Sequence, residues 1–283
     1  MRVTQSMLGH NSLKHLSNSY ERLGKLHDQL NTGKKITRPS DDPIVAMRGI
    51  TLRANVAEMK QFKRNFAEAH NWIDNTDAAL DQATEAMHRI HELAKRVANG
   101  TTEEGGKKAT AEEIKEIKEQ LINIANTKVG DKYIFSGTAT DQPAYGGQIN
   151  TEAVEIELGK GIKIPVNVTT EKVFSDDFFA KIDRLIEDIE TDGDLQQHIG
   201  QMEGLINDLV TERTSLGAKA NRVELMEQRV EMQEIMAKQL MSDNEDAEYE
   251  EVITQMVMEE SLLRASLSLS ARVIQPTLMD FLR

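Results

Sequence analysis

The stretch from Leu52 to Val97, LRANVAEMKQFKRNFAEAHNWIDNTDAALDQATEAMHRIHELAKRV, carries apolar residues at alternating spacings of three and four. One series recurs every seven residues: Val45, Leu52, Met59, Phe66, Ile73, Leu80, Met87 and Ala94. A second series has the same period: Phe62, Ala69, Thr76, Ala83, Ile90 and Val97. This spacing predicts a helix with one narrow buried stripe, as in coiled coils. A helix from about residue 43 to 98 would be roughly 80 Å long, which indicates an architectural protein.

The composition of the 283-residue chain limits the classes of function. Its formal net charge is −13, which argues against binding to nucleic acid or to an anionic membrane. It has no cysteine, and no apolar run reaches the roughly 18 residues of a membrane span. The first twenty residues contain no apolar segment of a secretory signal. Composition alone therefore favours a cytosolic protein.

The N-terminal segment has its own heptad spacing. It predicts a first helix whose apolar side chains form an assembly seam: Leu13, Leu16, Tyr20, Leu23 and Leu30, with His27 at one inner position. Gly33 is suited to end that helix in a left-handed conformation. Pro39 then interrupts helical structure, and Ser40, Asp41 or Asp42 can cap the long helix that follows.

The predicted layout is symmetrical about the middle of the chain, where a β insertion separates the first helices from a second long helix and a last helix. A shorter helix is expected through Ile114, Ile117, Leu121 and Ile124. Extended structure is expected from Lys132 to Gly137, and a β-hairpin around the turn at residues 159–161. A helix near Ser175 and a second long helix from about 195 to 241 follow, the latter with a seam at Leu209, Leu216, Val223, Val230 and Ala237. The last helix offers further candidate seam residues: Leu263, Leu267, Ile274 and Leu278.

We therefore predict a mainly α fold in which N- and C-terminal helical arms form an antiparallel coiled-coil rod with a small inserted β domain. The expected divisions are an assembly helix and turn (1–42), a rod arm (43–130), the β domain (131–175), a second rod arm (176–242) and a C-terminal assembly helix (243–283). Each terminal helix has a narrow apolar face and would be marginal alone in water, so contacts between subunits should stabilise it.

The sequence offers little catalytic chemistry. It contains no phosphate-binding loop, nucleophile elbow, dinucleotide glycine pattern or HExxH motif. His88 and His91 could share a metal, but their flanking residues occupy the seam, which favours a solvated surface. The pair Asp41–Asp42 is better explained by capping than by acid–base catalysis. We expect no enzyme activity, no cofactor and no metal.

Two segments resemble signatures of the flagellin family. LNTGKKITRPSDDP, residues 30–43, carries Gly33, Asp41 and Asp42; ERTSLGAKANRVE, residues 212–224, carries Arg213, Gly217, Asn221 and Arg222. The resemblance extends over about 1–140 and 195–283. DKYIFSGTATDQPAY, residues 131–145, and the ending SARVIQPTLMDFL are similar to members at the junction of hook and filament, more than to flagellin itself.

This resemblance implies a structural adaptor of the extracellular bacterial flagellum, exported through the flagellar type III pathway without a cleaved signal, contrary to the cytosolic expectation. The implied partners are further copies in a ring, the preceding hook-associated protein, flagellin and a cytosolic export chaperone. Nucleic acid and membranes are not expected partners. Two alternatives stay open: a flagellin, the filament subunit, and a cytosolic coiled-coil binding module.

Overall fold

A computed structural model describes residues 5–99, 104–147, 152–169, 173–191 and 193–274. Its helices are α1 (Gln5–Thr32), α2 (Pro43–Ala98), α3 (Glu104–Ala125), α5 (Asp176–Thr191), α6 (Leu195–Glu245) and α7 (Tyr249–Ile274). Its strands are β1 (Lys128–Val129), β2 (Lys132–Tyr133), β3 (Glu155–Gly159) and β4 (Ile162–Pro165), which form two antiparallel two-stranded sheets. The mainly α fold with a small β insertion is confirmed.

The contacts divide the chain into two compact units. The terminal unit comprises residues 1–58 and 234–283, and the central unit comprises residues 59–233. The first turns of α2 and the last turns of α6 therefore group with the terminal helices. The five expected divisions of the chain stay a prediction, since they describe segments of sequence and not contacts.

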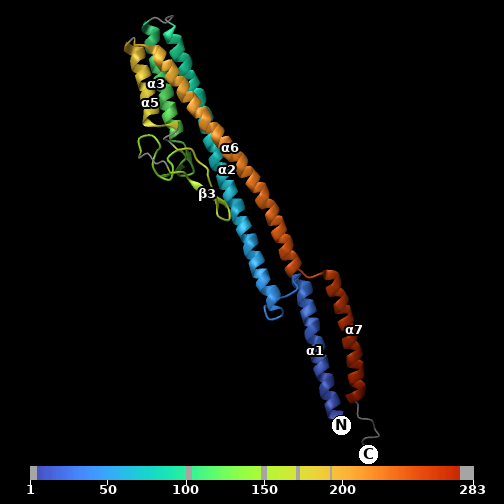
Figure 1. Cartoon of the computed structure of the whole chain (residues 1–283). Helices are drawn as coiled ribbons and strands as arrows, with labels where there is room; N and C mark the ends of the chain where they lie inside the picture. Colours follow the sequence, from blue (N-terminus) through green and yellow to red (C-terminus); the bar gives the residue numbers. More distant parts are fainter. Residues whose placement is uncertain (1–4, 100–103, 148–151, 170–172, 192, 275–283) are drawn as a thin grey trace, which may run out of the picture. The chain divides into compact units, whose positions relative to one another are not determined.

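The central unit holds a large apolar core on the predicted stripe of α2. Both series are buried throughout from Phe62 to Val97. Trp72 lies beside the stripe and is also buried, as expected of a packing residue at its edge. The buried face is wider than a coiled-coil seam because α3 and α5 pack together in the same unit (Figure 1). An ion pair from Arg89 of α2 to Glu113 links α2 to α3.

The β segment belongs to this core. The predicted hairpin is confirmed, with β3 paired to β4 and Gly161 in a left-handed turn at φ 72°. Leu158, Ile164 and Phe174 are almost completely buried in the core cluster of the central unit. The extended segment expected from Lys132 to Gly137 is a strand only at its first two residues. The β segment is thus packed onto the helices and is not a separable decoration.

The predicted helix boundaries of the terminal unit are also found. Helix α1 ends at Thr32, immediately before Gly33, which has φ 68°. The Asp42 carboxylate accepts the backbone amides of Ile44 and Val45 at 2.9 and 3.1 Å, so Asp42 is the N-cap of α2. Helices α1 and α7 lie side by side and run antiparallel (Figure 1).

Candidate assembly surface

The α1–α7 pair has a seam built largely from small and half-buried residues. On α1 the inward positions are Ser12, Leu16, Ser19, Leu23, Leu26 and Leu30. On α7 they are Val252, Met256, Glu259, Leu263, Ser266 and Ser270. Both sets follow the heptad spacing of a two-helix seam. Among the described residues, the buried apolar cluster here consists of Leu26, Val252 and Ala247, the last from the turn before α7, which is a small core for two helices of this length.

A charged pair replaces apolar contact in the middle of this seam. Arg22 Nε donates to Glu259 Oε1 at 2.7 Å, and its Nη2 donates to the Ser19 hydroxyl at 3.0 Å. The hydrogen bond to Glu259 raises the pKa of the Arg22 guanidinium. Since Arg22 is exposed, this ion pair sets the register of the two helices more than it stabilises them.

The outer faces of the terminal unit carry most of the exposed large apolar side chains in the described residues. They are Met7, Leu13, Tyr20, Ile44, Met47, Ile50, Ile235, Met236, Leu240, Tyr249, Ile253, Val257, Met258, Leu262, Leu267 and Leu269. The much larger central unit contributes Ile162, Val210, Leu225 and Met232. Helix α7 is apolar on both sides of its inner seam, which is typical of a helix surrounded by other helices. This exposed set is the candidate assembly surface.

The predicted seam residues fall into three groups. Leu16, Leu23, Leu30 and Leu263 are half-buried between α1 and α7. Leu13, Tyr20 and Leu267 are exposed at 60%, 57% and 44%, and are therefore available to other molecules. The Leu278 position and the Ile274 side chain lie outside what the structure describes. That these residues form assembly contacts stays a prediction.

The inner register of α1 differs in part from the prediction. His27, expected at an inner position, is exposed, and Leu26 is buried instead. Two overlapping heptad registers share Leu16, Leu23 and Leu30, so the spacing alone leaves the remaining positions open. Close packing of α1 on α7 uses Ser19, a small residue, where the prediction placed Tyr20.

A polar corner joins the elements of the terminal unit where α6 ends. The Ala247 amide donates to the Gly33 carbonyl at 2.9 Å, and the Lys35 amide donates to the Glu245 carbonyl at 2.6 Å. The Glu245 side chain is only 3% exposed and accepts from Arg53 Nε at 2.6 Å. A Cβ on Gly49 would lie 2.5 Å from Glu245 Oε1, so a larger residue there would displace the buried carboxylate.

Opposite charges reinforce this corner. Lys34 Nζ donates to Asp246 Oδ1 at 2.7 Å and lies 3.4 Å from Glu245. The Ser242 hydroxyl donates to the other Asp246 oxygen at 2.5 Å. The hydrogen bond from Lys34, together with that from Ser242, lowers the pKa of Asp246, and the same contact raises the pKa of Lys34.

The first family signature coincides with this corner. Besides its left-handed conformation, Gly33 leaves no room for a side chain, since a Cβ would lie 2.8 Å from the Tyr249 hydroxyl. Asp41 accepts the Arg38 amide at 3.1 Å and lies 3.6 Å from Lys25 Nζ. Gly33, Asp41 and Asp42 therefore have structural roles at the turn between α1 and α2.

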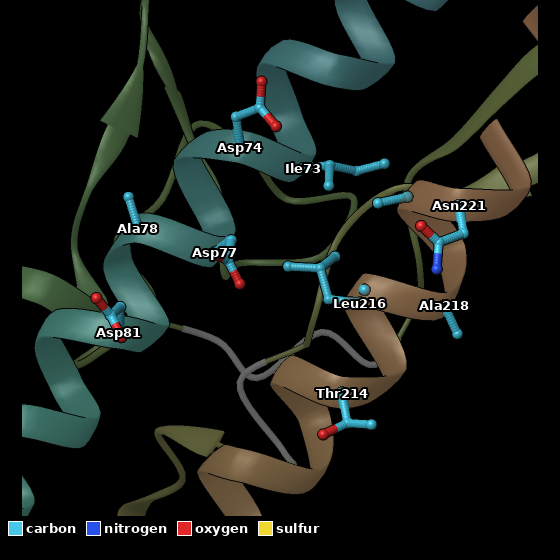
Figure 2. Close-up of a pocket in the computed structure, with 11 residues that line it drawn as sticks. Ile73, Asp74, Asp77, Ala78, Asp81, Thr214, Leu216, Ala218 and Asn221 are labelled. Atoms are coloured by element: carbon cyan, nitrogen blue, oxygen red, sulfur yellow. The ribbon is translucent and has the colours of Figure 1, made fainter. Parts of the chain in front are cut away.

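The second signature lies in the central unit, beside an open groove between α2 and α6. Arg213 of α6 donates to Asp77 at 2.8 Å and also contacts Asp81, which fastens α6 to α2. The hydrogen bond that Arg213 donates to Asp77, and after it the one to Asp81, raise the pKa of Arg213. Gly217 and Asn221 line the groove, where Figure 2 labels Asn221. Arg222, the next residue along α6, is exposed. The structure thus brings this motif together with three aspartates, which the sequence analysis did not connect to it.

The histidines His88 and His91 were the candidates for a metal site in the sequence. Among the described residues, no group of three or more histidine or acidic side chains is placed to hold a metal ion. His88 is exposed, and His91 is half-buried with a pKa lowered by burial and by Lys95. No helix in these segments is long and apolar enough to cross a membrane. The arrangement can bind helices and charged surfaces.

The sequence analysis missed two parts of the candidate assembly surface. Ile44, Met47 and Ile50 share one face at the start of α2 and are 65–76% exposed. They stand outside the Val45–Leu52 stripe, and their spacing of three could have identified them. On α7, Val257 and Met258 flank the predicted seam on opposite sides. The sequence of α7 contains more apolar residues than a single seam needs, and this excess could have identified them.

Comparison with known proteins agrees with this architecture. The family described as the bacterial flagellin N-terminal helical region matches residues 3–140, and the bacterial flagellin C-terminal helical region matches residues 199–282. The two regions together account for most of the chain. The remaining segment contains the β3–β4 hairpin and α5.

Individual relatives differ in how much of this chain they match. The flagellar hook-associated protein 3 of Escherichia coli strain K12 is 23% identical over 94% of this chain and 95% of its own length. Polar flagellin F of Vibrio parahaemolyticus is 25% identical, but over only 51% of this chain and 39% of its own length. The alignment with the hook-associated protein therefore covers more of both chains than the alignment with this flagellin.

A solved structure shows the same fold. The structure of a flagellar hook-associated protein from Vibrio parahaemolyticus has a TM-score of 0.65 at 20% identity, and covers 73% of this chain and 100% of that one. The chain belongs to the flagellin family, and along almost its whole length it is similar to a flagellar hook-associated protein 3.

Proposed function

We propose that the chain is a structural adaptor of the bacterial flagellum that joins the hook to the filament. The observation that carries this proposal is the contrast between the units: the terminal unit has a small apolar core, yet it carries most of the exposed large apolar side chains of the described residues. Burying the exposed half of a large apolar side chain contributes about 1 kcal/mol. The candidate assembly surface therefore favours insertion among other helices, as in the wall of a tube.

The partners follow from this role. Copies of the chain stand next to one another in a ring, one end of which meets the preceding hook-associated protein and the other end flagellin. Before assembly, the exposed apolar side chains of α7 would aggregate in water, which favours a cytosolic chaperone that covers them. Export through the flagellar type III pathway fits a chain that has no cysteine and hence no disulfide to prevent threading.

A flagellin is the second candidate. It shares the helical regions at both ends, which match the flagellin family over residues 3–140 and 199–282. Against it stands the extent of the alignment with hook-associated protein 3, which covers more of both chains than the alignment with polar flagellin F. A filament subunit and a junction protein differ in where and in what number they occur, and this difference can be observed.

The test is immunogold electron microscopy of intact cells with antibody against the central unit. A single band where hook meets filament is the result we expect. Label along the whole filament would identify a flagellin instead. Label confined to the cytoplasm would reject both flagellar functions and favour a cytosolic coiled-coil module.

A further inference from the structure

The groove between α2 and α6 has one acidic wall and one wall of small residues (Figure 2). It encloses about 940 Å³. Asp74, Asp77 and Asp81 project from successive turns of α2. The facing wall is Gly217 and Ala218, both exposed, and a Cβ on Gly217 would meet no atom within 4 Å. A helix from another molecule could therefore approach closely.

The groove keeps an excess of negative charge. Arg213 pairs with Asp77 and Asp81 from the edge of the groove. Asp74 is exposed, and among the described residues no basic group lies in contact with it. One guanidinium thus faces three carboxylates, so a basic helix is favoured over an acidic or neutral one.

A basic ridge on the same chain has complementary properties. Arg222, Leu225, Arg229 and Met232 follow one another on α6 at spacings of three, four and three. Leu225 and Met232 are 67% and 62% exposed, and both arginines are exposed without a carboxylate partner in the described segments. An exposed heptad stripe on a folded helix indicates a missing helical neighbour.

The ridge and the groove match in spacing. Arg222 and Arg229 are seven residues apart, as are Asp74 and Asp81, which corresponds to about 10.5 Å along either helix. Helix α6 runs antiparallel to α2, since Arg213 meets Asp77 whereas Glu227 meets His70. In a second copy that lies parallel to the first, α6 is likewise antiparallel to α2 of the first copy. The arginines of its ridge therefore meet the aspartates of the groove in reverse order of sequence.

We propose that the ridge of one copy docks in the groove of the next copy of this chain. Arg229 then lies opposite Asp74, Arg222 lies opposite Asp81, and Leu225 packs over Ala78 and Gly217. This inference rests on the proposed function in one respect, because it requires copies to stand side by side. It assigns a role to the segment from Glu212 to Glu224, whose Arg213 and Gly217 shape the groove.

The contact is heterologous, because the ridge and the groove are different surfaces. Each copy can therefore use its ridge on one neighbour and its groove on the other, and the contact repeats around a ring. The ridge lies about ten residues beyond the groove on α6, so neighbouring copies are displaced by about 15 Å along the helix axis. A two-fold dimer would instead bring ridge to ridge or groove to groove.

Cysteine cross-linking tests this contact without interference, because the chain has no cysteine of its own. The full chain carrying both Ala78→Cys and Leu225→Cys is oxidised in isolated flagella, and separately as concentrated purified protein. We expect a ladder of multimers from the double variant and monomers from either single variant. A matched control replaces Leu225→Cys with Lys163→Cys, an exposed residue of β4, and should give no ladder.

Charge reversal supplies the second arm. Arg222→Glu with Arg229→Glu, added to the cysteine pair, should reduce cross-linking about tenfold or more through like-charge repulsion. Arg184→Glu, an exposed arginine of α5, should leave it unchanged. Absence of the ladder in flagella that contain the chain would overturn the ridge–groove contact, as would dimers from Leu225→Cys alone. Absence of the chain from flagella would instead contradict the proposed function. Cross-linking of the purified protein would then still test the ridge–groove contact.

Discussion

The central and terminal units use apolar residues in opposite ways. In the central unit, Phe135, Leu158 and Phe174 come from the β segment and join the helices in one core. In the terminal unit, the seam of α1 and α7 buries Ser19 and Ser270, while Leu13 and Leu269 are exposed. A stable domain places its largest apolar side chains inside. The comparison supports the proposal that the terminal unit completes its core with other molecules, and it predicts that the central unit folds alone.

The largest effect is expected from the core of the central unit. Phe174 packs edge-to-face on Phe135 at 4.9 Å and is 1% exposed, so Phe174→Ala should destabilise the unit by about 3–5 kcal/mol. Trp72, the only tryptophan, reports urea unfolding of this unit by fluorescence. Leu26→Ala in the terminal unit is the matched control and should leave that transition within about 0.5 kcal/mol. Equal shifts from both variants would show that the units unfold as one.

The second effect separates folding from assembly. Leu13→Ser with Tyr20→Ser removes exposed side chains only, so the purified chain should keep its urea midpoint and fail to enter flagella. Leu16→Ala with Leu23→Ala affects the half-buried seam and should reduce both helix content and incorporation. Val210→Ser, at an exposed site of the central unit, should incorporate normally. Normal incorporation of the Leu13 and Tyr20 variant would refute the assembly role of the outer stripe.

A smaller effect is expected at the corner of the terminal unit. Gly49→Ala pushes a methyl group against the buried Glu245 carboxylate and should cost about 1–3 kcal/mol by disturbing its pairing with Arg53. Gly24→Ala is the matched control on α1, where a Cβ meets nothing, and should stabilise by about 0.5–1 kcal/mol. Circular dichroism during thermal unfolding measures both. Similar gains from the two variants would show that the Glu245 site is not tightly packed.

The smallest effect concerns pH. The pKa of Asp246 is lowered from its ordinary 3.8, so its pairing stabilises the corner above that value and is lost as pH falls below it. The pKa of Lys34 is raised from 10.5, so its contribution persists up to that pH and is lost above it. Exchange of the Ala247 amide, corrected for its intrinsic rate, should therefore accelerate below about pH 4. Asp246→Asn should remove this acid dependence, and an unchanged profile would exclude the pair as its cause.

The sequence predicted those parts of the fold in which one physical rule decides. The stripe from Phe62 to Val97 is buried because every member of its heptads faces the same core. The end of α1 at Gly33 and the N-cap at Asp42 follow from local backbone preferences, which need no tertiary contact. These elements were therefore predictable before any partner helix was known.

The other features of the fold and of the candidate site depend on contacts that the spacing of apolar residues does not reveal. Leu16, Leu23 and Leu30 fit both of two competing registers of α1, and only the packing of α7 selects the one that buries Ser19. The partners of Arg213, Asp77 and Asp81, lie far away in the sequence. Apolar content alone could not distinguish a helix with one neighbour from a helix with several, so the outer faces of α7 were missed.

The central claim is that the terminal unit is completed by neighbouring copies, whereas the central unit is complete in itself. Amide hydrogen exchange, compared between the purified chain and the chain in isolated flagella, tests it most directly. We predict that α1 and α7 exchange rapidly in the purified chain and become protected by at least about a hundredfold in flagella, while the buried stripe of α2 is protected in both. Equal protection of α1 and α7 in the two states would contradict the account.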